Sequence, residues 1–283
     1  MSIITISRGS LSATEKIAKK VSEKLNCPVV TREEVIEAAE KYGIKETGLG
    51  DISFIDKAPS FWHKVSDLRK QYLICFQTAL FDFALQGNLV YHGHLAQLLL
   101  QKIPFVLRVL LTAPVEYRIK TLMQESGKTM EEASNHIKLM DERRQKWSQF
   151  LYGVDWKDPV HYDIVYNIEK MNVDLIADLI TNVVTREEYK LSAESVQTLK
   201  NLHLASKAQA YLLKSPRTRG SEVKIEADIT TGTLVVTGTV PKMGSSIWES
   251  DIKHVLSEVE GVKTIKVIKS VLGYYETITM ETL

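Results

Sequence analysis

The amino-acid sequence predicts an α/β fold, a doubly wound parallel sheet of five strands, followed by a small α+β domain. Up to about residue 185, short apolar runs alternate with longer segments of helical periodicity, the order typical of a parallel sheet covered by helices. Beyond about residue 205 the order becomes helix, strand, strand, helix, strand, which indicates a separate core. A chain of 283 residues is also longer than one core usually organises, which favours two domains.

The domain boundaries follow from these changes in pattern. We expect a first domain at residues 1–185, a charged and polar linker at 186–205, a second domain at 206–270 and a C-terminal tail at 271–283.

The composition argues against several classes of protein. A net charge of +1 gives no reason to expect a nucleic-acid partner. No apolar run is long enough to span a membrane, so we expect a cytoplasmic protein and not an integral membrane protein. Cys27 and Cys75 lack the spacing of metal ligands, which is typical of free thiols in a reducing compartment.

The five strands of the first domain are predicted from its apolar runs. We expect them at residues 3–6, 28–30, 89–91, 105–111 and 164–166. Apolar residues at spacings of three and four predict helices between the strands. These helices end near residues 25 and 42 and then cover about 61–85, 95–100, 114–123, 129–150 and 173–184.

Three of the predicted helices begin with the pattern of a capping box. Ser12–Glu15, Thr31–Glu34 and Thr129–Glu132 each place a hydroxyl three residues before a glutamate. The hydroxyl accepts the glutamate's backbone N–H, and the carboxylate accepts the N–H of the capping residue. In the first of these boxes, Glu15 would also place negative charge where the helix dipole favours an anion.

The connection between the first strand and the first helix is where a mononucleotide-binding unit holds phosphate. The pattern G-x-x-x-x-G-K-S/T supplies glycines for close backbone approach and a lysine for the phosphates. This chain has Arg8-Gly9-Ser10-Leu11-Ser12-Ala13-Thr14-Glu15-Lys16 instead. Leu11, Ala13 and Thr14 carry side chains where a phosphate cradle needs bare backbone. Two interpretations follow, a modified phosphate loop that uses Arg8 or Lys16 as its cation and a plain self-capped helix.

The second domain has its own alternation of strands and helices. We expect a helix at about 206–213, a half-buried strand from residue 223, a turn at Thr231–Gly232 and a strand at 234–240. A helical stripe over 248–259 and a last strand over 262–268 complete it.

Four stretches of the first domain carry a resemblance to a known family. They are ITISR with IAKKVSEKL, VVTREEVIEAA, VYHGHLAQLLL with RVLLTAPVEYRIK, and DERRQKW through FLYGVDWKDPVHYDIVYN. Over roughly residues 1–185 the chain resembles the cytidylate-kinase-like family of the P-loop nucleoside monophosphate kinases. The resemblance implies that family's fold and ATP-dependent phosphoryl transfer to a pyrimidine nucleoside monophosphate, with Mg²⁺.

The resemblance also implies roles for individual residues. Arg118, after an A-P-x-E turn, and Arg144, after Asp141, match phosphate-clamping arginines, and these three residues are the expected catalytic group. Arg32, after the second strand, and His94, where an arginine would follow a glycine, are the expected substrate-binding residues. The expected residues for ATP are Arg8, Ser10, Ser12, Thr14 and Lys16, and no protein-only metal site is expected.

The chain departs from the family pattern mainly on the side of the phosphate donor. The glycine-rich loop is replaced, an arginine is replaced at His94, and Trp147 stands in place of a tyrosine. We therefore expect ATP turnover to be impaired.

Ordinary structural roles compete with several of these assignments. The charges around Arg144 also suit a solvated helix face, and His92 with His94 has no third ligand in register for zinc. The aromatic residues between Trp147 and Trp156 could stack a base or pack the helix on the sheet.

The second domain resembles a BON domain through GTLVVTGTV and EVEGVKTIKV. That resemblance implies a module that binds phospholipids or protein partners. Two classes of function remain open. One is a slow nucleotide kinase, and the other is a non-catalytic protein that binds a nucleotide or a partner.

Overall fold

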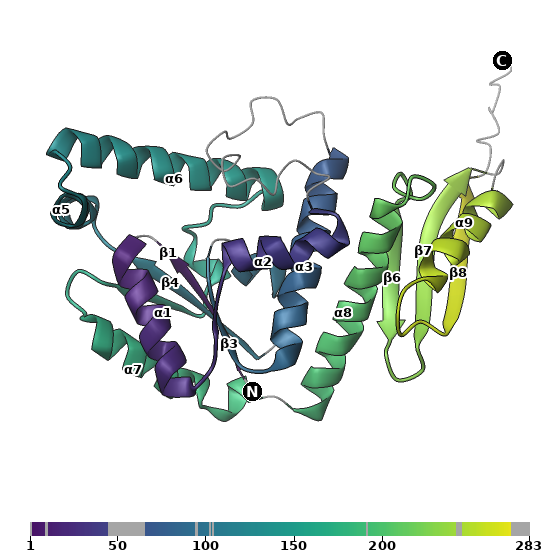
Figure 1. The fold of residues 1–283 in the computed structure, drawn as a ribbon, viewed down its shortest axis with the longest axis horizontal. Helices are drawn as coiled ribbons and strands as arrows, with labels where there is room; N and C mark the ends of the chain where they lie inside the picture. Colours follow the sequence, from purple (N-terminus) through teal and green to yellow (C-terminus); the bar gives the residue numbers. More distant parts are fainter. Residues whose placement is uncertain are drawn as a thin grey trace, which may run out of the picture. The chain divides into compact units, whose positions relative to one another are not determined.

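A computed structural model describes residues 2–8, 11–44, 66–93, 96–101, 103, 105–190, 192–241 and 245–272 of the chain. The chain divides into two compact units, unit 1 at Met1–Leu199 and unit 2 at Lys200–Leu283 (Figure 1).

Unit 1 is built on a five-stranded parallel sheet, as the sequence predicts. The strands are β1 (Ile3–Arg8), β2 (Val29–Thr31), β3 (Leu89–His92), β4 (Val106–Thr112) and β5 (Ile164–Asn167). Their order across the sheet is β2-β3-β1-β4-β5, and each neighbouring pair is parallel. The carboxyl ends of all five strands therefore meet at one edge of the sheet.

Helices follow each strand of unit 1, most of them where helical periodicity predicts them. They are α1 (Leu11–Leu25), α2 (Arg32–Ala38) with the 3₁₀ turn η1 (Ala39–Tyr42), α3 (Ser66–Gln86), α4 (Ala96–Leu99), α5 (Val115–Ser126), α6 (Met130–Tyr152) and α7 (Val173–Val184). The loop predicted before α3 and the first residues of the helix predicted from residue 61 lie outside the described residues.

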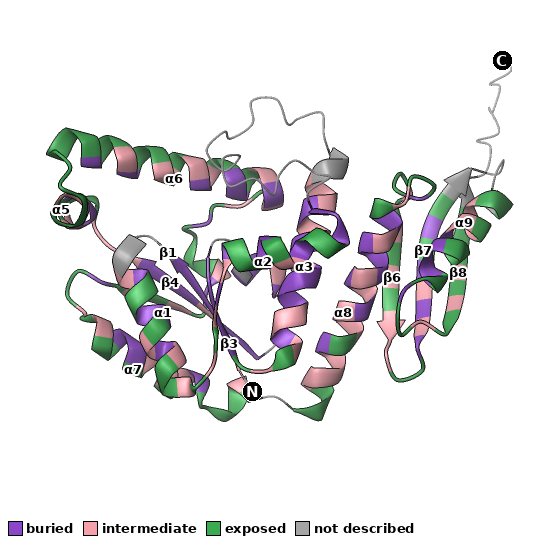
Figure 2. Ribbon diagram, viewed as in Figure 1, coloured by how far each residue is buried: buried purple, intermediate pink, exposed green. Residues whose placement is uncertain are grey.

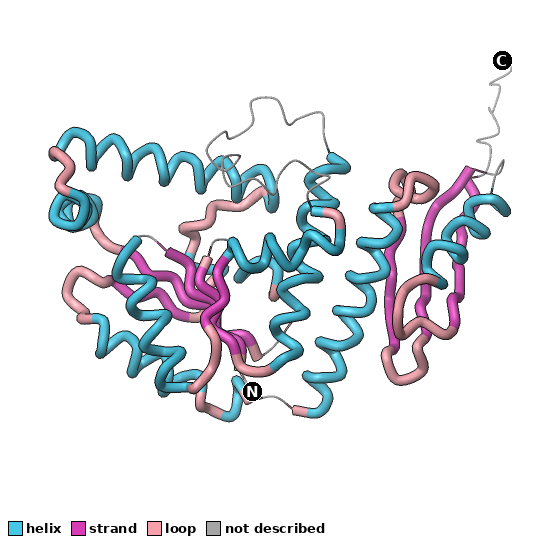
Figure 3. The backbone as a smooth tube through the Cα atoms, in the orientation of Figure 1, coloured by secondary structure: helices cyan, strands magenta, loops and turns pink. Residues whose placement is uncertain are grey.

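The sheet is covered on both faces, which makes the fold doubly wound (Figure 3). On one face, α1 and α7 bury a continuous apolar core with alternate residues of the strands, such as Ile4, Ile6 and Val109 (Figure 2). On the other face, the Phe76 ring of α3 meets the ring of Tyr91 of β3 edge-on, with centroids 6.4 Å apart.

Two of the three predicted capping boxes are confirmed, and the first is wrong. The boxes of Thr31 with Glu34 and of Thr129 with Glu132 are both complete. Helix α1 begins at Leu11, so Ser12 lies inside the helix and does not cap it. The residues from Leu11 to Thr14 are compatible with a helix and include no glycine, so the helix extends past Ser12 toward β1.

The early start of α1 also removes the predicted electrostatic role of Glu15. No acidic residue lies in the first turn of α1, and Glu15 is an exposed residue of the second turn. The dipole effect of a charge decays within the first turn, so Glu15 does not oppose an anion there.

Unit 2 contains most of α8 (Ala193–Lys214) and then β6 (Val223–Asp228), β7 (Thr233–Pro241), α9 (Ser245–Ser257) and β8 (Thr264–Leu272). The sheet order is β6-β7-β8, with the first pair antiparallel and the second parallel. Leu204, Ala208 and Leu212 of α8 pack with Leu234, Val236 and α9 in one core. The predicted α+β domain is therefore present.

The helix predicted to start near residue 206 starts at Ala193. Charged and polar residues at 193–205 indicate a linker by composition, but they allow the helix to begin earlier. The predicted domain boundaries themselves stay a prediction.

No helix among the described residues is both long enough and apolar enough to cross a membrane.

Candidate functional site

The carboxyl edge of the parallel sheet is the expected place for a ligand. In open α/β sheets, ligands bind beyond the carboxyl ends of the strands, where the strand order reverses. Here that reversal is at β1, between β3 and β4. Arg32 directly follows β2, and α4 and α5 follow β3 and β4, so the chain brings its candidate side chains to this edge.

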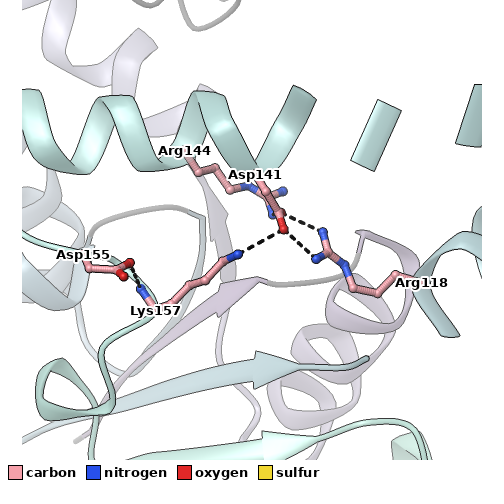
Figure 4. Close-up of polar contacts among 5 residues, drawn as sticks. All are labelled: Arg118, Asp141, Arg144, Asp155 and Lys157. Carbon is pink, nitrogen blue, oxygen red and sulfur yellow. Dashed lines mark hydrogen bonds and ion pairs between the residues drawn. The ribbon is translucent and has the colours of Figure 1, made fainter. Parts of the chain in front are cut away.

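An ion cluster joins α5, α6 and the segment after α6 (Figure 4). It consists of Arg118, Asp141, Arg144 and Lys157 and is called the ion cluster below. Arg118 donates to both carboxylate oxygens of Asp141, at 2.7 and 2.8 Å. Lys157 Nζ donates to Asp141 Oδ2 at 3.2 Å, and Arg144 Nη1 lies 3.9 Å from Asp141 Oδ1. The three residues predicted to be catalytic therefore lie together.

At the centre of the ion cluster the two arginines are buried and Asp141 is partly buried. The Arg118, Asp141 and Arg144 side chains are 9%, 16% and 7% exposed, whereas that of Lys157 is half exposed. Burial favours the uncharged form of Asp141, but the hydrogen bonds and charge of Arg118, with those of Lys157, outweigh it and lower the pKa of Asp141. The carboxylate is thus charged at neutral pH.

An indole ring lies beside two of these cations. The Arg144 guanidinium carbon is 5.6 Å from the centroid of the Trp156 ring, and Lys157 Nζ is 5.4 Å from it. Both distances lie within the range of cation–π attraction. Trp156 is 2% exposed, so it packs inside the protein and does not offer its ring to a base.

The charges of the ion cluster suit an anion with several oxygens. Three cations share one carboxylate, which leaves a net charge of +2. Both Nη atoms of Arg118 are held by Asp141, so a phosphate would reach this guanidinium only by displacing or sharing the carboxylate.

Arg32 lies after β2 and is 8% exposed. Its Nη2 donates to the Tyr72 hydroxyl of α3 at 3.1 Å. Its Nη1 is buried and has no hydrogen-bond partner among the described residues. A buried, unpaired N–H of a cation is unfavourable, and an anionic oxygen relieves it most effectively.

Of the residues predicted to bind ATP, the structure describes the side chains of Thr14 and Lys16. Thr14 is fully buried within α1, and Lys16 is exposed on the same helix. Ser10, His94 and the side chains of Arg8 and Ser12 lie outside the described residues.

The aromatic residues near the end of α6 serve packing. Trp147 is buried, with its ring centroid 6.2 Å from that of Tyr72 and 5.9 Å from that of Phe150. Among the described residues, no group of three or more His, Cys, Asp and Glu side chains could hold a metal ion.

Sequence reasoning missed Lys157. It lies 16 residues after Asp141, beyond the end of α6, so helical periodicity does not connect the two. The only sequence signal is its place inside the last stretch that resembles the family.

Comparisons with known proteins find relatives of unit 1. The model of the cytidylate kinase-like family matches residues 3–170. The chain is 26% identical over 106 residues to a cytidylate kinase of Staphylothermus marinus, across 38% of this chain and 59% of that protein. It is 27% identical over 187 residues to a cytidylate kinase of Ignicoccus hospitalis, across 65% of this chain and 99% of that protein. The solved structure of an uncharacterised protein from Eubacterium ventriosum matches with a TM-score of 0.51 and 24% identity, across 66% of this chain and 100% of that chain.

Proposed function

Because the chain belongs to the cytidylate kinase-like family, we propose that unit 1 binds a pyrimidine nucleoside monophosphate and that its phosphoryl transfer from ATP is impaired. The monophosphate lies at the carboxyl edge of the sheet, with its phosphate on Arg32 and near the ion cluster. The part of the site that binds the phosphate acceptor is thus retained, and the part that binds the phosphate donor, ATP, is reduced.

The observation that carries this proposal is the short connection between β1 and α1. β1 ends at Arg8 and α1 begins at Leu11, so two residues join them. A phosphate loop wraps several backbone N–H groups around the phosphates between strand and helix. In this proposal a connection of two residues is too short to enclose a phosphate, and the helical positions of Ala13 and Thr14 in α1 support it.

The same observation bears on ATP and Mg²⁺, which the family implies for an active member. In this proposal the β1–α1 connection is too short for the phosphates of ATP, and Mg²⁺, which binds largely through those phosphates, loses its site with them.

The acceptor side is supported by Arg32. Its buried Nη1, which has no hydrogen-bond partner in the described part of the chain, is a donor that a phosphate oxygen would satisfy, while Tyr72 fixes the other end of the guanidinium. In this proposal Arg144 and Lys157 add positive charge near the phosphate. Arg118 also donates to the phosphate when the phosphate competes with the Asp141 carboxylate for its guanidinium.

Titration calorimetry of the full chain tests this proposal. We expect heat of binding with cytidine or uridine monophosphate and weak or no heat with ATP and Mg²⁺. Arg32→Lys, which loses the second Nη donor, should weaken monophosphate binding about tenfold or more. Arg217→Lys is the matched control, because Arg217 is an exposed arginine of unit 2. Tight ATP binding together with diphosphate production at a normal kinase rate would contradict the proposal.

For unit 2 we propose a BON-like module that binds a protein or phospholipid partner. The order α8, β6, β7, α9, β8 supports it, together with a sheet face opposite the helices on which Lys224, Thr237 and Lys266 are exposed. Flotation of the full chain with anionic vesicles tests the lipid reading, with Lys224→Glu/Lys266→Glu as the variant. If neither the wild type nor the variant floats with the vesicles, a phospholipid partner is excluded and a protein partner remains the proposal.

A further inference from the structure

A chain of buried hydrogen bonds crosses unit 1 between three segments that are far apart in sequence. Ser7 Oγ of β1 donates to Gln97 Oε1 of α4 at 2.9 Å. Gln97 Nε2 donates to the Tyr162 hydroxyl at 2.9 Å, and this hydroxyl donates to the Trp156 carbonyl at 2.6 Å. The four residues are at most 7% exposed, and Gln97 is fully buried.

The carbonyl at the end of this series determines which group donates in every one of its hydrogen bonds. The Trp156 carbonyl can only accept, so the Tyr162 hydroxyl donates its one proton to it. Gln97 must then donate to Tyr162 with its NH₂ group, which leaves its oxygen for Ser7. Burial raises the pKa of Tyr162, so its hydroxyl keeps the proton that the chain needs.

The series of hydrogen bonds ends at Trp156, the residue that supports the ion cluster. The carbonyl of Trp156 belongs to the same residue whose indole lies beside Arg144 and Lys157, and Lys157 is the next residue along the chain. Holding this carbonyl therefore fixes the backbone from which both the ring and Lys157 extend.

We propose that Gln97 is a positioning residue, which acts through Tyr162 and Trp156 to set the placement of Arg144 and Lys157. A side chain in this position must accept from Ser7 and donate to Tyr162, and glutamine does both. Its effect on nucleotide affinity rests on the proposed function, whereas its effect on the placement of the indole does not.

The first experiment measures the indole directly and needs no ligand. In the ¹⁵N-labelled full chain, the Nε1–H resonance of Trp156 is assigned with Trp156→Phe. Gln97→Met keeps the length of the side chain and removes both hydrogen bonds, so this resonance should shift. Gln77→Met is the matched control, because Gln77 of α3 donates its side-chain amide to the backbone carbonyl of Leu99 in α4 at 2.8 Å and has no bond to Ser7, Tyr162 or Trp156 among the described contacts.

The second experiment measures affinity for cytidine monophosphate. Gln97→Met should raise the dissociation constant about three- to tenfold, and Gln77→Met should leave it unchanged. In an Arg144→Ala/Lys157→Ala background, the effect of Gln97→Met should disappear, because nothing remains to be positioned. A loss of affinity that persists in full in that background would mean general damage and would overturn the inference.

A further variant covers the case in which Gln97→Met fails to fold. Gln97→Glu keeps the shape, and at a pH at which the new side chain is ionised its carboxylate only accepts, so it draws the Tyr162 proton away from the Trp156 carbonyl. We expect the Trp156 resonance to shift in a folded protein. An unchanged resonance in either folded variant overturns the inference. Absence of cytidine monophosphate binding to the wild-type protein refutes the proposed function alone.

Discussion

Asp141→Asn is the sharpest test of the ion cluster. The substitution keeps the size of the side chain but removes the carboxylate that pairs with Arg118, Arg144 and Lys157. Breaking a buried pair by removing one partner costs about 3–5 kcal/mol. Asparagine keeps one acceptor oxygen for Arg118, so we expect the lower end, about 3 kcal/mol at pH 7. For a domain of this size, that corresponds to a fall in Tm of roughly 6–12 °C.

The stability difference between wild type and Asp141→Asn should also depend on pH. The pKa of Asp141 is lowered in the folded protein, so its contribution is complete above the unfolded value of about 4 and is lost as the pH falls through the folded value. Urea unfolding of wild type and Asp141→Asn should therefore differ at pH 7 and converge below about pH 4.

The control for this test is Asp155→Asn. Asp155 is an exposed residue that accepts the backbone N–H of Lys157 at 2.9 Å, and asparagine can accept it as well (Figure 4). We expect a change below about 0.5 kcal/mol. If Asp141→Asn is as stable as wild type, or if its deficit is the same at pH 7 and pH 3, the electrostatic account of the cluster is wrong.

Three further predictions concern local structure. Gly232→Ala should destabilise unit 2 by about 2 kcal/mol or more in urea unfolding, because φ is +67° and a Cβ would lie 2.8 Å from the Gly261 carbonyl oxygen, whereas Gly220→Ala should be nearly neutral. Thr129→Ala should lower the stability of α6 by about 1 kcal/mol in the same assay, since it removes the capping hydroxyl. The carboxylate of Glu249, which accepts from Lys253 and Lys269, should titrate near its pKa of about 2 in an NMR experiment and closer to an ordinary value in Lys269→Met. Because that folded value is lowered, the carboxylate stabilises the fold above its unfolded pKa, and this contribution is lost as the pH falls through about 2.

The strands and most helices of this fold could be predicted from sequence, because local patterns determine them. Alternating apolar runs predict each of the five parallel strands, and the glutamates three residues after Thr31 and Thr129 predict two helix starts. The same pattern failed at Ser12, because a helix of residues without glycine could extend by two more residues, Leu11 and Ser12, toward β1. Helix α8 was underestimated for a similar reason, since polar residues at 193–205 do not prevent a helix.

The candidate site was less predictable, because its contacts join distant parts of the chain. Arg118, Asp141 and Arg144 were found through resemblance to a family, and the structure brings them together. Their partner Lys157 could not be found by spacing, since only the fold brings it to Asp141. Gln97 also lies inside a stretch that resembles the family, but a glutamine in a short helix looks like any surface residue until its burial is known.

The outer edge of the small sheet of unit 2 affects how the protein behaves at high concentration. Within the described residues, β8 is an outer strand, and an outer strand can recruit a strand from another molecule. Lys266 and Lys269 are exposed on β8, and Lys263 is exposed just before it. Like charges brought face to face repel, so these lysines hinder identical molecules from extending one another's sheets into aggregates.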